Sequence, residues 1–203
     1  MNNEPATWKR LVIPHNSSIL NTQKKREELF KWAVQNKIDA VVFPFYTTQA
    51  IAEEAYSFDL VPEAGGWCMS LLVPRKLFLF HKDLFRMEGG KRQKKIHFCP
   101  TNPETIAILR EEGKKVFGAL QKLQCFHLWP DEGEEETWCS CPTCRAFTRP
   151  EQNRIAVNAV ADVLLEINPK AALSIYEETD NDSEIKLRPN VSRINRESIV
   201  TSK

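Results

Sequence analysis

The sequence has almost no excess of charge of either sign. Its 203 residues include 28 Lys and Arg against 27 Asp and Glu, which gives a formal net charge of +1. A protein that is held to nucleic acid by bulk charge has a clear basic excess, so this balance argues against that class. The basic run at residues 91–95 lacks interleaved aromatic side chains on which bases could stack, and we interpret it as a solvated loop. We therefore expect no nucleic-acid partner.

The sequence also lacks a long hydrophobic run. The longest apolar stretches, such as residues 40–43, are far too short to span a bilayer. No apolar segment follows the charges of the first ten residues, so no secretory signal is visible. We expect a soluble, cytoplasmic protein with no membrane partner, although a secreted full-length form is also compatible with a chain that is a fragment. Hydrophobic residues make up 42% of the chain, which is enough for a packed core.

Apolar strands alternate with amphipathic helices along the chain. Helices are expected after the N-cap candidates Asn21 and Thr22, over residues 49–56, after Asn102, and after the capping box that begins at Thr148. Strands are expected at residues 9–15, 39–45, 58–64, 124–129 and 171–177. Continuous apolar strands separated by helices indicate a parallel sheet covered by helices.

Two α/β architectures fit this order, an open doubly wound sheet and a (β/α) barrel. No glycine-rich phosphate-binding loop follows the first strand, which weakens the doubly wound alternative. In a barrel, the active-site residues gather just past the C-terminal ends of the strands. Polar and acidic residues occur at these positions here, namely His15, Glu63, Asp131, Glu132 and Glu177. We therefore predict a TIM-type barrel.

The predicted barrel is incomplete. A full barrel takes eight βα units in about 250 residues, whereas about five units fit into residues 1–180. Strands six to eight are then largely missing, and the polar tail at residues 181–203 holds at most one more strand, near residues 184–191. Because an incomplete barrel leaves strand edges unpaired, we expect the chain to be marginally soluble or to self-associate.

Three of the six cysteines lie close together, at Cys139, Cys141 and Cys144. In a reducing cytosol such a cluster is more often a metal or redox site than a disulfide framework. A structural zinc ion needs four ligands, for which Cys99 is our fourth candidate and His97 the reserve. A disulfide within the set, a redox pair and unligated thiols remain the alternatives.

Two stretches resemble a known family. Residues 126–132 (FHLWPDE), followed by residues 138–145 (WCSCPTCR), are similar to the bacterial family catalogued as domain of unknown function 4838. Shorter supporting stretches lie at residues 13–17, 63–66 and 98–104. The resemblance covers roughly residues 8–190 and implies a barrel related to glycoside hydrolases, in a family whose activity is largely unassigned.

A remoter similarity is to glycoside hydrolase family 20, the β-hexosaminidases, in which a His-x-Gly-Gly-Asp-Glu pattern closes the fourth strand. His127, Asp131 and Glu132 keep that spacing, with residues 129–130 (Trp-Pro) in place of the two glycines. The similarity implies that Glu132 is the general acid, and that Asp131 orients an acetamido group acting as an internal nucleophile. After the third strand both families commonly have a His, where this chain has Trp67.

The sequence thus predicts a glycoside-hydrolase-like protein that binds, and in complete form hydrolyses, an amino sugar or acidic glycan. The expected catalytic residues are Glu132 and Asp131. The residues expected to contact the carbohydrate are His15, Glu63, Trp67, His127, Trp129 and Glu177. Three alternatives stay open at this point: a non-catalytic carbohydrate-binding or interaction module, a zinc-stabilised structural protein, and a hydrogen-bonded core role for His127.

Overall fold

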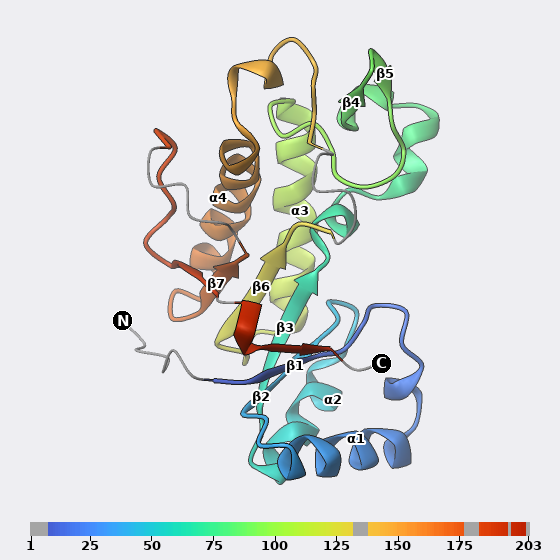
Figure 1. The fold of residues 1–203 in the computed structure, drawn as a ribbon, viewed down its shortest axis with the longest axis vertical. Helices are drawn as coiled ribbons and strands as arrows, with labels where there is room; N and C mark the ends of the chain where they lie inside the picture. The colour runs from blue at the N-terminus through green and yellow to red at the C-terminus, as the bar shows by residue number, and fades with distance from the viewer. Residues whose placement is uncertain (1–7, 132–137, 177–182, 195, 202–203) are drawn as a thin grey trace.

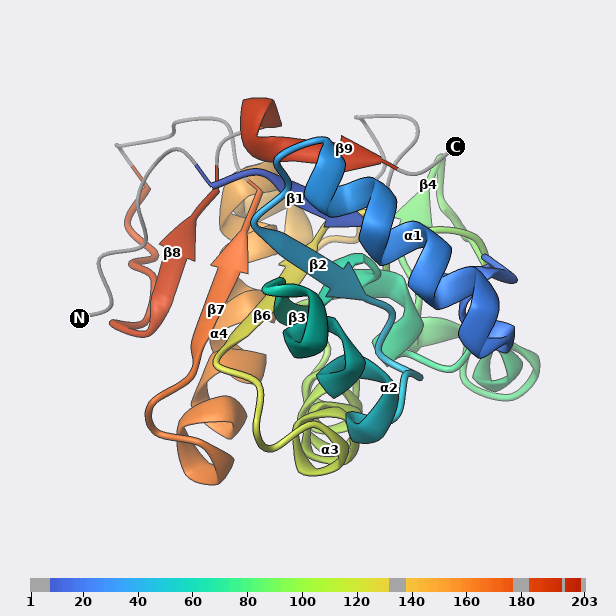
Figure 2. The same cartoon turned by 90° about the horizontal axis from the view of Figure 1, so that it is seen from below.

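The computed structural model describes residues 8–131, 138–176, 183–194 and 196–201. Within these residues seven strands form one parallel sheet in the order β8-β7-β6-β3-β2-β1-β9. Their bounds are β1 Arg10–Val12, β2 Ala40–Phe43, β3 Val61–Trp67, β6 Cys125–Trp129, β7 Ala172–Ile175, β8 Val191–Arg193 and β9 Ile199–Thr201. Figure 2 shows the strands following one another around a curve from β8 to β9. The predicted partial TIM-type barrel is confirmed.

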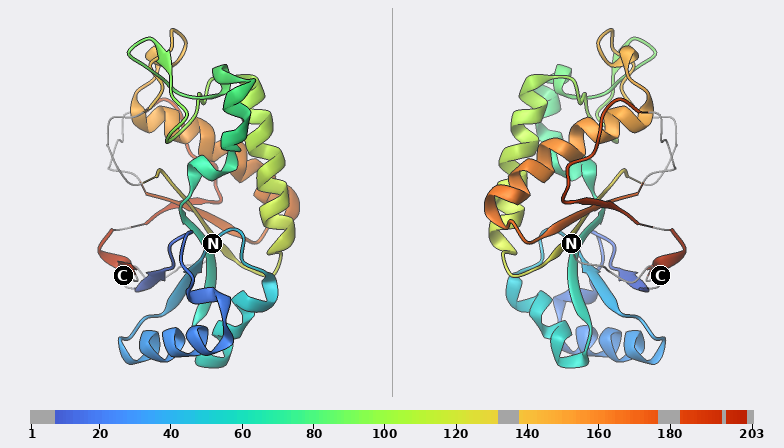
Figure 3. Two further views of the ribbon diagram at one scale, coloured as in Figure 1. Left: turned by 90° about the vertical axis from the view of Figure 1, so that its right-hand side faces the viewer. Right: turned by 90° about the vertical axis from the view of Figure 1, so that its left-hand side faces the viewer.

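Helices lie between the successive strands of the sheet from β1 to β7. The α-helices are α1 Gln23–Gln35, α2 Gln49–Glu53, α3 Pro103–Ala119 and α4 Arg149–Ile167. The predicted caps are confirmed at Thr22, Asn102 and Thr148, whose side chains accept hydrogen bonds from first-turn amides that would otherwise lack partners. Helices α3 and α4 pack against each other at one end of the molecule, and α1 and α2 lie at the other (Figures 1 and 3).

None of the helices in the described ranges is both long enough and apolar enough to cross a membrane.

The two faces of the sheet bury different chemistry, because successive side chains of a strand point to opposite faces. Leu11 and Val41 belong to the large core that also contains the buried helix side chains. Their neighbours Val12 and Val42 belong to a second apolar cluster with Trp129. The face that carries this second cluster also carries buried charged and polar side chains, which are described below.

Strand β3 has the predicted length but begins and ends three residues later than the sequence predicts. We expected it to end at Ala64, before the glycine pair, but it continues through Gly65 and Gly66 to Trp67. Both glycines have positive φ angles, of 122° and 105°. A Cβ on Gly65 would lie 1.9 Å from the carbonyl oxygen of His127 on β6. Glycine is therefore required by the close approach of two strands and not by a turn.

The C-terminal residues contribute two strands to the sheet, where we expected at most one. Strand β8 pairs with β7, whereas β9 pairs with β1 so that Ile199 lies opposite Arg10. Each strand is three residues long, which is too short for a periodic hydrophobic pattern to be recognised. The sheet consequently has one strand more at each edge than the five strands that we predicted from the main apolar runs.

We expect Gly65→Ala to destabilise the protein by at least about 3 kcal/mol, or to prevent folding, because the added Cβ displaces the β6 backbone. The matched control is Gly118→Ala in α3, where an added Cβ meets no neighbouring group within 4 Å. This control should be neutral or stabilising by up to about 1 kcal/mol. Urea unfolding followed by circular dichroism measures both variants, and equal stabilities would contradict the close approach.

Candidate functional site

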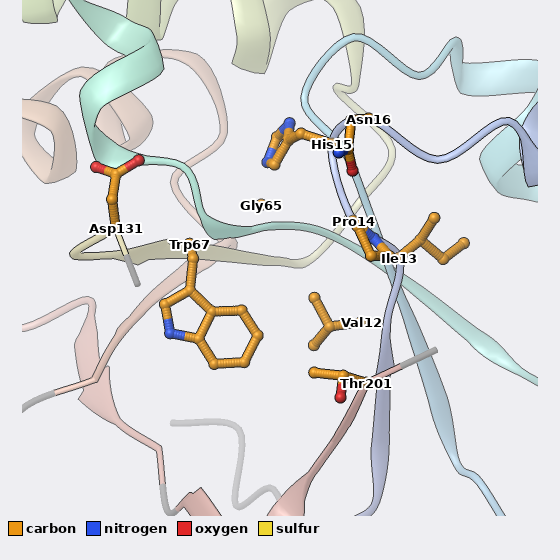
Figure 4. Close-up of a pocket in the computed structure, with 9 residues that line it drawn as sticks. All are labelled: Val12, Ile13, Pro14, His15, Asn16, Gly65, Trp67, Asp131 and Thr201. Atoms are coloured by element: carbon orange, nitrogen blue, oxygen red, sulfur yellow. The ribbon is translucent and has the colours of Figure 1, made fainter. Parts of the chain in front are cut away.

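A pocket of about 440 Å³ opens at the C-terminal ends of the strands. Its walls include His15 after β1, Trp67 at the end of β3, Asp131 after β6 and Thr201 at the end of β9 (Figure 4). Active sites of TIM-type barrels lie at this rim because the loops that follow the parallel strands meet there. The structure therefore brings together three of the residues that the sequence predicts, His15, Trp67 and Asp131.

Ser70 holds the side chain of Asp131 at the pocket wall. The backbone amide of Ser70 donates to Oδ2 of Asp131 at 2.8 Å, and its hydroxyl donates to Oδ1 at 2.7 Å. Burial raises the pKa of Asp131, while the hydrogen bonds from Ser70 and the charge of Arg75 oppose that shift. Both carboxylate oxygens are thus oriented before any ligand binds.

His15 presents an unsatisfied polar group to the pocket. Both nitrogens of its ring are buried, and neither has a hydrogen-bond partner among the described residues. The ring packs edge-on against Phe45 and Tyr46. Burial lowers the pKa of His15 to about 4, although the nearby backbone of Gly65 opposes the shift, so near neutral pH one ring nitrogen donates and the other accepts. Because unpaired buried polar atoms are costly, a ligand that binds them gains affinity.

Beneath the pocket, the carboxylate of Glu63 lies in a buried charged network. It accepts a hydrogen bond from Nε of Arg10 at 2.8 Å and lies 2.8 Å from Nε2 of His127. Nδ1 of His127 in turn contacts the hydroxyl of Ser174 on β7. Burial by itself would raise the pKa of Glu63, but the charges and hydrogen bonds of His127 and Arg10 lower it.

Three residues that we expected to contact a sugar lie below the pocket instead. Glu63, His127 and Trp129 have no exposed surface. The indole N–H of Trp129 donates to Ser174 at 3.1 Å, and its ring packs edge-on against Trp67 with centroids 4.9 Å apart. Because their polar atoms are satisfied within the protein, these side chains support the pocket rather than line it. His127 is thus a buried, hydrogen-bonded side chain in this structure, as the open alternative for this residue describes.

The other two predicted residues, Glu132 and Glu177, lie outside the described residues.

Ser70 and Thr201 were not predicted from the sequence. Ser70 lies three residues beyond the end of β3, so the rule that functional residues follow strand ends could have identified it. Thr201 could not have been found in this way, because its position depends on the pairing of β9 with β1.

The four predicted metal ligands form one buried cluster. The sulfurs of Cys99, Cys139, Cys141 and Cys144 all lie within 4.8 Å of one another, and this group could hold a metal ion. Sγ of Cys99 lies 3.7 Å from both Cys141 and Cys144. All six cysteines are free thiols. Cys99, and not the reserve candidate His97, thus completes the cluster.

The four-cysteine cluster joins three segments that are distant in sequence. The backbone amide of Met87 donates to Sγ of Cys139 at 3.3 Å, and Nη1 of Arg92 lies 3.8 Å from the same sulfur. The side-chain amide of Gln152 in α4 donates to the carbonyls of Cys139 and Cys144. Residues 91–95, which we expected to form a solvated loop, begin with a short strand, β5 (Lys91–Arg92), that pairs with β4 (Met87–Glu88).

The thiols of the cluster do not ionise independently. Hydrogen bonds from Cys139 and Cys144 lower the pKa of Cys99, whereas the hydrogen bonds with Cys139 and Cys99 raise the pKa of Cys144. One thiolate is therefore stabilised by its protonated neighbours. A bound cation is what allows all four to lose their protons together.

No family model matches the chain, and no curated protein does. Solved structures match its fold at low sequence identity. A GH20 catalytic module of the pneumococcal exo-β-D-N-acetylglucosaminidase StrH is 12% identical with a TM-score of 0.63, over 93% of this chain and 59% of that one. The chain has a glycoside-hydrolase-like fold.

Two further neighbours share this fold. The β-N-acetylhexosaminidase from Bacteroides fragilis is 13% identical with a TM-score of 0.55, over 92% of this chain and 45% of that one. The β-galactosidase from Bacillus circulans sp. alkalophilus is 11% identical with a TM-score of 0.56, over 87% and 40%. The chain therefore spans less than two thirds of each of these neighbours, and the similarity concerns the fold alone.

We expect the stability of the protein to fall between pH 6.5 and pH 4.5 in a manner that depends on His15. The unfolded chain protonates His15 near pH 6.5, whereas the folded protein resists protonation down to about pH 4, so acid favours the unfolded state. The contribution is on the order of 2 kcal/mol after allowance for partial solvent access. Urea unfolding of the wild type and of His15→Gln at pH 7 and pH 4.5 measures it. Identical pH slopes would remove His15 as the cause.

Proposed function

We propose that this chain binds a carbohydrate in the pocket at the strand ends and belongs to an enzyme that hydrolyses an amino sugar or acidic glycan. The observation that carries the proposal is the pairing, in one pocket, of an oriented carboxylate with an imidazole whose two nitrogens have no hydrogen-bond partner in the described part of the chain. Sugar hydroxyls both donate and accept hydrogen bonds, so they suit Asp131 and His15 together. The indole of Trp67 supplies an apolar surface on which a sugar ring can stack.

In the proposed reaction, Asp131 accepts a hydrogen bond from the N–H of an acetamido group and orients it toward the anomeric carbon. The acetamido oxygen attacks that carbon while Glu132 donates its proton to the leaving glycosidic oxygen. Water then opens the cyclic intermediate and returns a proton to Glu132. The role of Glu132 rests on its position directly after Asp131 in the sequence and on the resemblance of residues 127–132 to the family 20 pattern.

The sequence-based assignments extend this proposal. We propose that the chain is a member of the domain of unknown function 4838 family. We also propose that its barrel-forming part comprises the predicted residues 1–180 together with strands β8 and β9, which belong to the same sheet. We also retain the prediction that the strand edges recruit a second chain, because β8 and β9 each pair on one side only within the described sheet.

We expect Asp131→Asn to weaken sugar binding at least about tenfold, since a hydrogen bond to a charged group contributes about 1.5–3 kcal/mol. Isothermal titration with N-acetylglucosamine and with glucuronic acid measures this and distinguishes the two sugar classes. The matched control is Asp162→Asn on α4, where Asp162 pairs with Arg188 at 2.6 Å, which should leave affinity unchanged. If the wild type binds neither sugar, the carbohydrate proposal fails.

Glu132→Gln should abolish hydrolysis of chromogenic N-acetylhexosaminides and glucuronides while sugar binding persists, because the change removes the acid but almost no volume. Glu112→Gln in α3 is the control and should retain the wild-type rate. An unchanged rate in Glu132→Gln would remove Glu132 from the mechanism. Binding without cleavage by the wild type would favour the non-catalytic module.

We further propose that the metal of the four-cysteine cluster is zinc. Four thiolates form a soft, closed ligand set typical of structural zinc. In a tetrahedral site with Zn–S distances of about 2.3 Å, the sulfurs lie about 3.8 Å apart. The separations of 3.7 Å from Cys99 to Cys141 and Cys144 are close to that value. The amide of Met87 and the guanidinium of Arg92 are hydrogen-bond donors next to the sulfur of Cys139. Such donors stabilise a thiolate that is bound to a metal ion.

We expect purified protein to carry about one zinc per chain, lost on acidification as the thiolates protonate. Chelation should lower the melting temperature, because binding energy in a structural site is folding energy. Cys99→Ser should reduce zinc content, whereas Cys68→Ser, outside the cluster, should not. Elemental analysis and a thiol count decide between the alternatives. No metal with all thiols reactive would rule out the site, and no metal with an even number of thiols missing would indicate a disulfide.

A further inference from the structure

His97 lies between the four-cysteine cluster and the pocket and has an unsatisfied nitrogen. Its ring stacks on Trp138 with centroids 4.5 Å apart and an interplanar angle of 8°. Nδ1 of His97 is buried without a hydrogen-bond partner among the described residues, and it lies 3.9 Å from Oδ2 of Asp131. A movement of about 1 Å would bring the two groups into hydrogen-bond distance.

The backbone at His97 is strained. Ile96 and His97 have φ angles of 50° and 51°, a left-handed conformation that is rare for residues other than glycine and most unusual for a β-branched one. Such conformations persist only where surrounding contacts impose them, and they concentrate at functional sites. Here Arg75 imposes one contact, because its Nη1 donates to the carbonyl of His97 at 3.0 Å. Its Nη2 donates to the carbonyl of Ser70, the residue that holds Asp131.

Both stacked residues lie within two positions of a cysteine of the cluster in the sequence. Trp138 is the residue before Cys139, and His97 lies two residues before Cys99. A metal ion that binds both cysteines therefore fixes both chain segments that carry the stacked rings. Without it, His97 is held beside Asp131 by side-chain packing, by the contacts of Arg75 and by the hydrogen bond from the amide of Cys99 to the carbonyl of Leu84.

We propose that His97 is a positioning residue for Asp131, and that metal in the four-cysteine cluster holds His97 in place through its stack on Trp138. This inference rests on the proposed metal site and deepens the proposed function of the pocket. A filled cluster keeps the Asp131 carboxylate oriented toward the ligand, and loss of the metal releases it.

Hydrogen exchange of the Ser70 amide tests this link, because that amide donates to Asp131 and so reports whether the carboxylate stays in place. The full chain is compared with zinc bound and after chelation, at constant pH. We expect chelation to speed exchange at Ser70 at least about fivefold, the lower end of typical coupling between sites. Amides of α1, at the opposite end of the molecule, should be unaffected.

Variants of the stack separate positioning from general stability. Trp138→Phe keeps an aromatic ring and should retain the zinc dependence of the Ser70 amide, whereas Trp138→Ala should lose it while still binding zinc. His97→Asn removes the ring but tolerates the left-handed backbone, so it should fold, bind zinc and show fast Ser70 exchange in both states.

The outcomes distinguish the separate proposals. Stoichiometric zinc with unchanged Ser70 exchange overturns the positioning role, and so does faster exchange throughout α1, which would mean general unfolding. Absence of zinc by elemental analysis overturns this inference together with the metal site. A zinc-dependent Ser70 amide in a protein that binds neither N-acetylglucosamine nor glucuronic acid supports the positioning role and removes only the carbohydrate proposal.

Discussion

The buried carboxylate of Glu63 is the group on which the curved sheet depends. A charge without exposed surface is costly unless it is paired and hydrogen-bonded, and removing one partner of such a pair typically costs about 3–5 kcal/mol. Glu63 on β3 finds its partners in Arg10 on β1 and His127 on β6, and His127 extends the network to Ser174 on β7. Four strands are thus joined across one face of the sheet by side chains, in addition to their backbone ladders.

The contrast between the two layers of this face is the reason that we propose the pocket as the ligand-binding site. In the lower layer, Glu63 and His127 satisfy each other and have no access to solvent. In the upper layer, Asp131 is oriented by Ser70 while both nitrogens of His15 remain without partners among the described residues. The hydrogen bonds of the lower layer make the base of the pocket rigid. The unpaired polar atoms of the upper layer favour the binding of a ligand that can form hydrogen bonds with them.

The four-cysteine cluster gives order to segments that have little regular structure. In the long connection between β3 and α3, the regular structure consists of short 3-10 helices and one hairpin whose two strands, β4 and β5, have two residues each. The segment buries apolar side chains such as Met69, Leu84 and Phe85 in the main core, which offsets part of the entropy of ordering it. The cluster joins the hairpin, the residues before α3 and the start of α4, and it does so next to His97 and Asp131. The order of the pocket wall is for this reason linked to the state of the cysteines.

The sequence by itself determined the α/β class, the helix caps and the group of Cys139, Cys141 and Cys144, because apolar runs, capping residues and thiol spacing are local properties. Cys99 could be added only through the predicted barrel, in which the loop after the third strand faces the loop after the fourth. The sequence also placed Asp131 at a strand end. Only the tertiary structure decided that β3 continues through Gly65, that Glu63 is paired below the pocket, and that the ring nitrogens of His15 find no hydrogen-bond partner within the described ranges. Each of these outcomes depends on which atoms strands far apart in the sequence bring within a few ångströms of one another, and no local pattern records those distances.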